Sequence, residues 1–145
     1  MNSRLEKILR IRAELKELGD YDTSIAGAVG EIYAEEILGM QKVPRGTAGF
    51  DGHINGRRVA VKAKEENNRR PSETYVEVRE KVLDQVDDLL VVELANGIRP
   101  THLGPIPINE LAGRPNKSRK TRYYLSEIKR VLRLREETSL RPSHD

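Results

Sequence analysis

A short segment of the chain, residues 49–64, places acidic and basic side chains on what should be one face of a β-hairpin. Asn55-Gly56, the strongest short-range hairpin signal, separates two β-compatible runs, so residues 49–54 and 57–64 are expected to pair as antiparallel strands. Because side chains alternate across a strand, one face should collect the polar and small ones, with Asp51 opposite Ala60. That face comprises Asp51, His53, Arg58, Ala60, Lys62 and Lys64. It combines a carboxylate with cationic groups, the side-chain types that bind hard cations and phosphates.

A further carboxylate is expected on this face from the next strand. The segment "TYVEV" alternates as a strand should, and a symmetric pairing across the polar loop before it places Glu77 opposite Lys62. A slip of one residue would turn Glu77 toward the core, so parity favours this face. The other face of the hairpin is apolar and is expected to pack on helices; it carries Phe50, Ile54, Val59, Val61 and Ala63.

The order of these residues resembles the PD-(D/E)xK nuclease superfamily, also called restriction-endonuclease-like. A helix with a glutamate precedes a strand that opens on aspartate, and the hairpin partner of that strand ends in a lysine after an apolar residue. Within the superfamily, "GEIYAEEILG", "GFD" and "GRRVAVKA" are similar to a compact family whose strand usually reads V-Q-I-K, and the similarity spans roughly residues 24–95. The resemblance implies Asp51 as a metal ligand, Lys62 as the residue that orients or activates the attacking water, and Glu31 as an outer-shell carboxylate. It also implies Mg²⁺ or Mn²⁺ as the cofactor and hydrolysis of nucleic-acid phosphodiester bonds as the reaction.

The sequence departs from the superfamily pattern at Ala60, which stands where the superfamily has its second acidic ligand and the nearest family has glutamine. Hard cations need oxygen ligands, so the site loses one. Glu77 is the candidate replacement, as metal ligand and catalytic residue, because the predicted pairing brings it to Lys62. The expected activity is that of a nuclease with a degenerate second-acid position.

Each residue of this candidate site also has a structural interpretation. Asp51 fits a turn, and Glu31 fits the solvent face of an amphipathic helix. Lys62 and Glu77 fit an ordinary cross-strand ion pair, worth about 0.2–1 kcal/mol at a surface. The alternative function is a noncatalytic nucleic-acid-binding or assembly module on the same fold, and a third is a protein-interaction domain that uses its helical pair.

Basic residues are concentrated in the C-terminal part of the chain. Residues 114–135 contain nine lysines and arginines against a single acid, Glu127, although the formal net charge of the whole chain is only +3. This distribution favours a polyanionic partner, and nucleic acid is expected, with DNA indicated by family analogy; a solvated helix face is the alternative. Tyr123 and Tyr124 could stack on bases, as aromatic residues of single-strand binders do, or belong to the core. The candidate nucleic-acid contacts are Arg57, Arg58, Lys64, Arg69, Arg70, Lys117, Arg119, Lys120 and Arg122.

Helix and strand signals outside the hairpin indicate the elements that position these residues. Apolar residues at helical spacing predict a helix over residues 3–18 and a second helix, capped by Thr23 or Ser24, that ends at Gly39. The apolar run "DDLLVVEL" predicts a central strand covered on both faces, and "INELAG" predicts a short helix after two prolines.

The C-terminal segment has two interpretations. Residues 122–135 fit either a short strand followed by a helix capped by Ser126 or one continuous helix. The expected fold is α/β, a restriction-endonuclease-like mixed sheet of four or five strands flanked by helices. A single domain over residues 1–145 would comprise an N-terminal helix in 1–22, a core in 23–112 and a basic C-terminal segment in 113–145.

Length and composition limit the class of protein. The 145 residues match a single domain, and 34% charged side chains with 37% hydrophobic ones are typical of a charged surface over an aliphatic core. Without cysteine the chain has neither a disulfide nor a thiolate metal site. No run resembles a secretory signal or is long enough to span a bilayer, so a cytoplasmic protein without membrane contact is expected. Cutting both strands of a duplex would normally need two sites, so a homodimer is one expected arrangement.

Overall fold

The computed structural model describes residues 3–19, 21, 24–44, 49–65, 71–95 and 99–140. Arg69 and Arg70, two of the expected nucleic-acid contacts, lie outside the described residues. In chain order the elements are α1 (Ser3–Glu17), α2 (Ile25–Leu38), β1 (Gln41–Lys42), β2 (Gly52–Ile54), β3 (Arg57–Glu65), the 3-10 helix η1 (Pro71–Glu73), β4 (Tyr75–Arg79), η2 (Glu80–Gln85), β5 (Asp88–Ala95), β6 (Arg99–Pro107), η3 (Ile108–Glu110), β7 (Arg114–Pro115), β8 (Lys120–Tyr124) and α3 (Leu125–Leu140).

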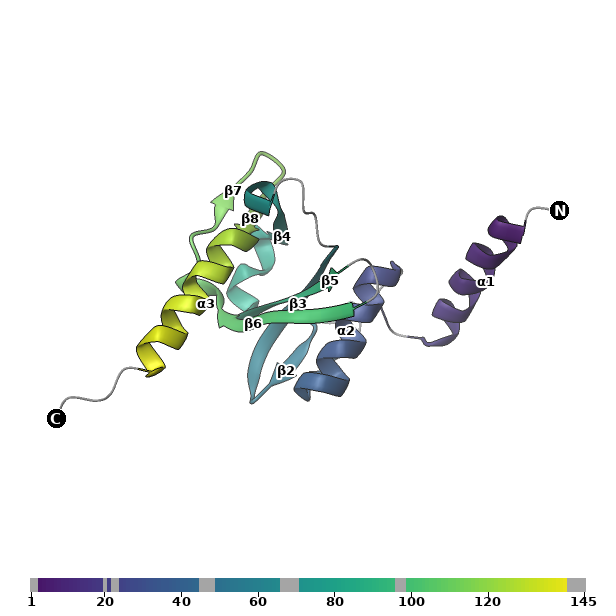
Figure 1. Cartoon of the computed structure of the whole chain (residues 1–145), viewed down its shortest axis with the longest axis horizontal. Coiled ribbons are helices and arrows are strands. Elements are labelled where there is room, and N and C mark those ends of the chain that lie inside the picture. The colour runs from purple at the N-terminus through teal and green to yellow at the C-terminus, as the bar shows by residue number, and fades with distance from the viewer. Residues whose placement is uncertain are drawn as a thin grey trace.

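The strands form two sheets (Figure 1). A five-stranded main sheet has the order β1-β2-β3-β5-β6, in which β3 and β5 are parallel and the other neighbours antiparallel. This confirms the predicted α/β architecture with a mixed sheet flanked by helices. A second, small sheet of three antiparallel strands has the order β4-β8-β7 and was not predicted.

The hairpin register follows the prediction from Asn55-Gly56. His53 lies opposite Arg58 and Gly52 opposite Val59, and both turn residues have positive φ, +52° at Asn55 and +77° at Gly56. Two consecutive residues with positive φ are what a two-residue turn between right-twisted strands requires. The local sequence therefore determines which side chains share a face of β3.

Helix α2 covers one face of the main sheet at close range. The Ser24 hydroxyl accepts a hydrogen bond from the Gly27 N–H at 3.0 Å, and Gly39, with φ +70°, ends the helix, as predicted for both residues. A Cβ built on Gly30 would lie 3.2 Å from the Cβ of Ala63, so glycine allows the helix to approach β3. The buried face of the helix is consequently made of small residues and Glu31, whereas Ile25 and Ile37 are exposed.

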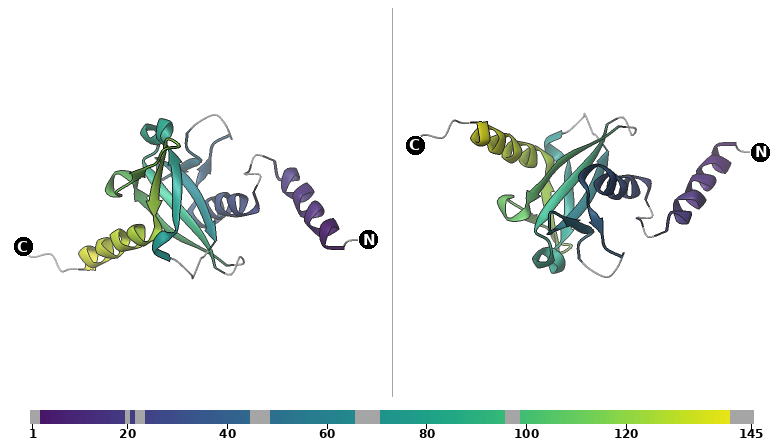
Figure 2. Two further views of the ribbon diagram at one scale, coloured as in Figure 1. Left: turned by 90° about the horizontal axis from the view of Figure 1, so that it is seen from above. Right: turned by 90° about the horizontal axis from the view of Figure 1, so that it is seen from below.

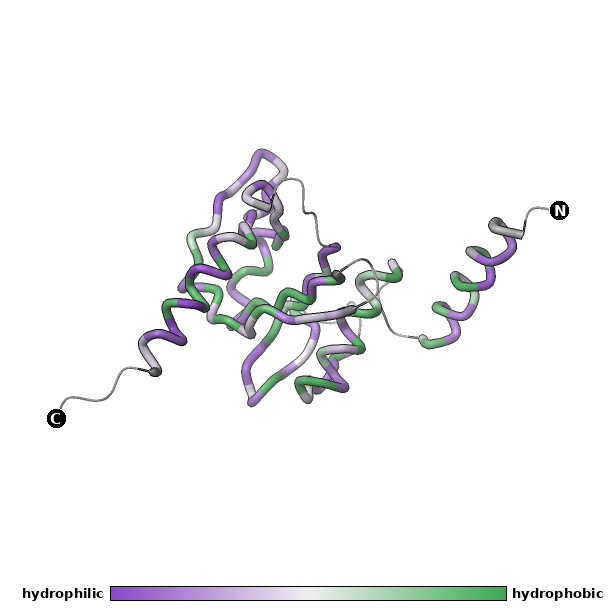
Figure 3. The backbone as a smooth tube through the Cα atoms, viewed as in Figure 1, coloured by the Kyte–Doolittle hydropathy of each residue, from purple (hydrophilic) through white to green (hydrophobic). Residues whose placement is uncertain are grey.

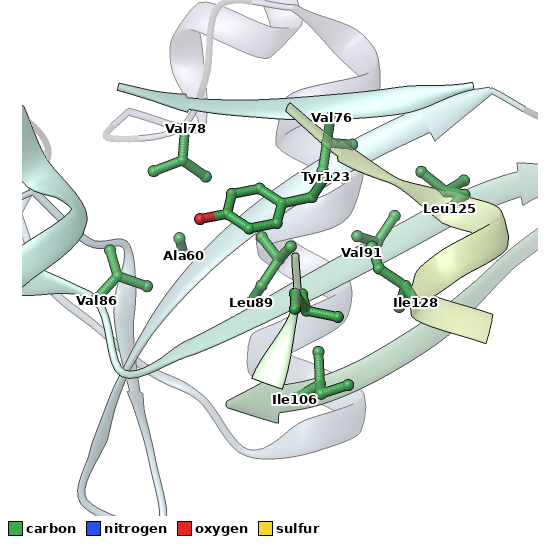
Figure 4. Close-up of a cluster of buried hydrophobic side chains, with 11 residues drawn as sticks. Ala60, Val76, Val78, Val86, Leu89, Val91, Ile106, Tyr123, Leu125 and Ile128 are labelled. Atoms are coloured by element: carbon green, nitrogen blue, oxygen red, sulfur yellow. The ribbon is translucent and has the colours of Figure 1, made fainter. Parts of the chain in front are cut away.

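The main sheet separates two hydrophobic clusters. On the α2 face, Val59, Val61, Leu90 and Val92 pack with Ala34. The opposite face is covered by the small sheet and α3, whose inward side chains form the cluster drawn in Figure 4. Strand β5 contributes to both clusters, and its four central residues, Leu89, Leu90, Val91 and Val92, are fully buried, which confirms the strand predicted from "DDLLVVEL" as covered on both faces.

In the C-terminal part of the chain, one of the two interpretations of residues 122–135 is confirmed, and one strand, β6, was not predicted. Strand β8 is followed by α3, so the strand-then-helix interpretation is right, but the helix begins at Leu125 and Ser126 lies in its first turn. Strand β6 was not predicted because Pro100, Pro105 and Pro107 interrupt its sequence. It forms an edge of the main sheet, where a proline need not donate a ladder hydrogen bond.

Helix α1 projects away from the two sheets (Figures 1 and 2). Hydrophobic and hydrophilic residues alternate along it (Figure 3), and Leu9, Ile11 and Leu18 are exposed. Among the described residues, no helix combines the length and the apolar composition that a membrane crossing requires.

Candidate functional site

Asp51 takes part in the hairpin through its side chain. Its Oδ2 accepts a hydrogen bond from the Val61 N–H at 2.7 Å, and its own N–H donates to the Val59 carbonyl at 2.8 Å. Because β2 begins only at Gly52, the carboxylate supplies the acceptor that a longer β2 would have offered to β3. The carboxylate thus lies beside the backbone immediately before Lys62.

Ala60 is a core residue, which corrects the expected polar face of the hairpin. It is 4% exposed and lies among Val86, Leu89 and Tyr123 (Figure 4). The predicted alternation is right, but the small sheet covers the middle of this face. The face is therefore interrupted, with Arg58 on one side of the cluster and Lys62 with Lys64 on the other.

Glu77 does not lie opposite Lys62, and that part of the prediction is wrong. Both neighbours of β3 in the main sheet are other strands, β2 and β5, while β4 pairs with β8 and sets Glu77 opposite Arg122. Val76 and Val78 point into the core, so Glu77 points from the outer face of the small sheet. There its carboxylate accepts a hydrogen bond from the Asn116 side-chain amide at 2.6 Å and lies 3.7 Å from the Arg122 Nε.

Glu31 and Lys62 start from opposite faces of the main sheet. Helix α2 covers the face lined by Val61 and Ala63, and Glu31 is only 9% exposed on the sheet side of that helix. Lys62, between those two residues in β3, projects from the other face. Glu31 is consequently not a solvent-face residue, and the structure does not bring it to Lys62.

The residues expected to hold Mg²⁺ or Mn²⁺ do not fit that role together. Asp51 immediately precedes β2 of the main sheet, Glu77 lies in β4 of the small sheet, and Ala60 is a core residue without a side-chain oxygen. Within the described ranges, no three side chains of His, Asp or Glu gather in a way that could hold a metal ion.

Two expected nucleic-acid contacts, Arg57 and Arg58, are engaged in ion pairs with the start of β5. Arg57 binds both carboxylate oxygens of Asp88, at 2.9 and 2.8 Å, and Arg58 binds those of Asp87 at 3.1 and 3.0 Å. The Arg58 guanidinium, followed by the Arg58 backbone N–H, lowers the pKa of Asp87 from its ordinary value of 3.8 to about 2. These arginines therefore connect β3 to β5.

The outer face of the small sheet gathers aromatic and basic side chains that sequence reasoning did not place together. In adjacent strands, Tyr75 lies opposite Tyr124, and Arg79 lies opposite Lys120. Between these pairs, Arg122 lies opposite Glu77 on one side and Arg114 on the other. The name tyrosine-arginine face refers to these residues: Tyr75, Glu77, Arg79, Arg114, Lys120, Arg122 and Tyr124.

Cations lie over both tyrosine rings of this face. The ring centroids of Tyr75 and Tyr124 are 5.5 Å apart. The guanidinium carbon of Arg122 is 4.5 Å from the Tyr75 centroid, and that of Arg114 is 5.2 Å from the Tyr124 centroid. The Lys64 Nζ, from β3, lies 5.8 Å from the Tyr75 centroid. Cation-π attraction thus positions three basic side chains beside the two rings.

A cavity of about 560 Å³ adjoins the Arg79-Lys120 pair and is called the basic groove. Its lining residues are Arg79, Glu80, Lys81, Ser118, Arg119 and Lys120. The turn between β7 and β8 shapes one wall, because the Asn116 side-chain oxygen accepts hydrogen bonds from the backbone N–H groups of Ser118 and Lys120. Lys117 and Arg119 are exposed in this turn.

The basic residues of segment 114–135 accordingly fall into two groups. In α3, Lys129 pairs with Glu93 at 3.4 Å and Arg135 with Glu110 at 2.9 Å. In β7, β8 and the turn between them, the cations share the tyrosine-arginine face and the basic groove. Arg130 and Arg133 of α3 are exposed as well, but the five cations of β7, β8 and their turn lie together beside the two tyrosine rings and the groove.

Base stacking and a core position were the two interpretations of Tyr123 and Tyr124, and the structure separates the two residues: Tyr123 is core and Tyr124 is half-buried. Tyr123 is 5% exposed, and its burial raises the pKa of its hydroxyl. Tyr124, the next residue in β8, points to the opposite face. The alternation of side chains in the segment "KTRYY" was the sequence signal that places these two tyrosines on opposite faces of the strand.

Neither a protein-family model nor a curated protein matches the chain.

Proposed function

We propose that the protein binds nucleic acid without cleaving it, through the tyrosine-arginine face and the adjoining basic groove. The observation that carries this proposal is the gathering of Arg79, Arg114, Lys120 and Arg122 on one sheet face whose one acid, Glu77, is already bonded to Asn116. The groove extends the same charge with Lys81 and Arg119. This function is the noncatalytic alternative to a nuclease. We also propose that the protein is cytoplasmic.

Phosphate neutralisation is the physical basis of the proposed affinity. Lysine and arginine side chains that contact phosphates release condensed counterions, so affinity falls as salt rises. If four of the cations contact phosphates of a single strand, the affinity should fall roughly 50-fold between about 50 and 200 mM salt. Arginines contribute directed hydrogen bonds as well as charge.

A charge-removal experiment tests the proposal. Fluorescence anisotropy with labelled DNA and RNA should show salt-sensitive binding that the double variant Arg119→Gln, Lys120→Gln weakens at least tenfold. The matched control is Arg130→Gln, Arg133→Gln, which removes the same charge from exposed positions of α3. Equal losses in the two double variants would mean that only net charge matters, and the assignment to this face would be wrong.

A metal-dependent reaction has no support from the arrangement of the donors. Asp51 is hydrogen-bonded to β3, Glu77 lies in the other sheet, and Ala60 is core. Lys62 remains beside Asp51 along β3, so an assay with Mn²⁺ on the Lys62→Ala variant tests the nuclease alternative. Cleavage by the parent that this variant loses would favour that alternative over the present proposal.

A further inference from the structure

We infer that the nucleic acid bound is single-stranded and that its bases stack on Tyr75 and Tyr124. This inference rests on the proposed function and goes further by naming the class of nucleic acid. The two rings lie at facing positions of β4 and β8, with their planes inclined at 57° and their centroids 5.5 Å apart.

The surroundings of the two tyrosines are those of a binding surface. Their inward neighbours, Val76 and Tyr123, are buried in the core, whereas Tyr75 and Tyr124 are only half-buried on the outer face. The ring contacts of this pair are each other and the basic groups of Lys64, Arg114 and Arg122. Aromatic rings and guanidinium planes are the two kinds of flat group on which unpaired bases stack.

Strand geometry fixes the rings before any ligand arrives. The sheet fixes the backbone of each tyrosine, and the contacts of the rings with each other and with the cations restrain the side chains, so little freedom is lost on binding. The Asn116 side-chain amide donates a hydrogen bond to the Glu77 carboxylate at 2.6 Å, and the Arg122 Nε lies 3.7 Å from the same oxygen. Repulsion between the one acid of the face and a phosphate is thereby reduced.

The distance from the rings to the groove suits a short single strand. Tyr75 and Arg79 are four positions apart in β4, which at about 3.3 Å per residue is about 13 Å. A strand whose bases lie on the tyrosines can therefore place neighbouring phosphates at Arg79 and Lys120, and then in the basic groove. A duplex offers its phosphates to the same cations, but its bases are stacked internally and cannot reach the rings.

Paired measurements on single strands and on the matching duplex test this inference. The variant Tyr75→Leu, Tyr124→Leu removes both rings but keeps apolar side chains on the strands. We expect it to weaken single-strand binding by about 5- to 150-fold for each stacked base, and to leave duplex binding unchanged. The variant Tyr75→Phe, Tyr124→Phe retains the rings and should bind as the parent does.

Tyrosine fluorescence provides a readout that does not depend on the leucine variant folding. The chain has five tyrosines and no tryptophan, so its intrinsic emission comes from tyrosine. Single-stranded oligonucleotide should quench part of the parent emission, and the phenylalanine variant should lose that part while keeping its affinity. Quenching that persists in the phenylalanine variant would overturn the inference.

The outcomes separate the two proposals. Binding of both single strand and duplex with equal affinity, unaffected by the leucine substitutions, would refute base stacking and leave nucleic-acid binding intact. An absence of binding to either form at low salt would refute the proposed function itself.

Discussion

Replacing Ala60 with glutamate distinguishes most sharply between a covered and an open face of β3. If the chain has the metal site that the superfamily resemblance implies, an acid at this position should complete that site. The structure instead surrounds the position with Val78, Leu89 and Tyr123, and leaves it 4% exposed.

The magnitude follows from two costs. Inserting the longer side chain into a packed cluster costs about 1–3 kcal/mol, because neighbours must shift or adopt unfavourable rotamers. The carboxyl group adds about 1–3 kcal/mol even when protonated, because the apolar cluster offers it no hydrogen-bond partner. The variant Ala60→Glu should therefore be destabilised by roughly 2–6 kcal/mol, a large fraction of the 5–15 kcal/mol typical of a domain.

Urea unfolding followed by far-UV circular dichroism measures this change. The matched control is Ala13→Glu, which makes the same substitution at an exposed position of α1 and should stay within about 0.5 kcal/mol of the parent. If Ala60→Glu were as stable as the control and gained stability with Mg²⁺, the face would be open and the reasoning refuted.

Three further predictions concern the contacts that hold β3. The pKa of Asp87 is lowered to about 2 in the folded protein by Arg58, so this pair stabilises the fold above about pH 4 and its contribution is lost as the pH falls toward 2. Arg58→Gln should abolish that part of the acid dependence of the melting temperature, and an unchanged dependence between about pH 4 and pH 2 would contradict the pairing. Asp51→Ala should cost about 1–3 kcal/mol in urea unfolding because the Val61 N–H loses its acceptor, whereas Asp51→Asn, which keeps an oxygen there, should cost less than half as much. Gly30→Leu should separate α2 from β3 and cost about 1–3 kcal/mol, and a variant as stable as the parent would argue against the close approach.

Local sequence signals predicted the parts of the fold that local physics determines. Asn55-Gly56 fixed the hairpin register because positive φ at two consecutive residues is specified within the turn itself. Ser24 and Gly39 ended α2 for similarly local reasons. The run from Leu89 to Val92 predicted a doubly covered strand because only burial on both faces accommodates four consecutive apolar residues.

Local sequence signals did not predict which distant segments pair as strands. The alternation of Tyr75, Val76 and Glu77 gives the faces of β4 but does not identify its partner, which lies in residues 120–124. Symmetric pairing across the polar loop before β4 suggested β3 as its partner, yet β3 already has β2 and β5 as neighbours. Placing β4 in another sheet moved Glu77 away from Lys62 and covered Ala60, so one long-range choice changed the whole candidate site.

The tyrosine-arginine face depends on the same choice. Tyr124 and Arg122 could be assigned to one side of a strand from the sequence, but Tyr75 joins them only through the pairing of β4 with β8. The basic residues near β8 were therefore predicted as candidate contacts, and the pairing of Tyr75 with Tyr124 between them was not predicted.

The most direct test is one titration of a labelled single-stranded oligonucleotide, carried out in EDTA and in Mn²⁺, with binding and strand length followed together. We expect salt-sensitive binding that does not require Mn²⁺ and that is weakened by Arg119→Gln with Lys120→Gln, and we expect an intact oligonucleotide at the end. Binding that requires Mn²⁺, or cleavage that disappears in Lys62→Ala, would contradict noncatalytic binding and favour a nuclease site at β3.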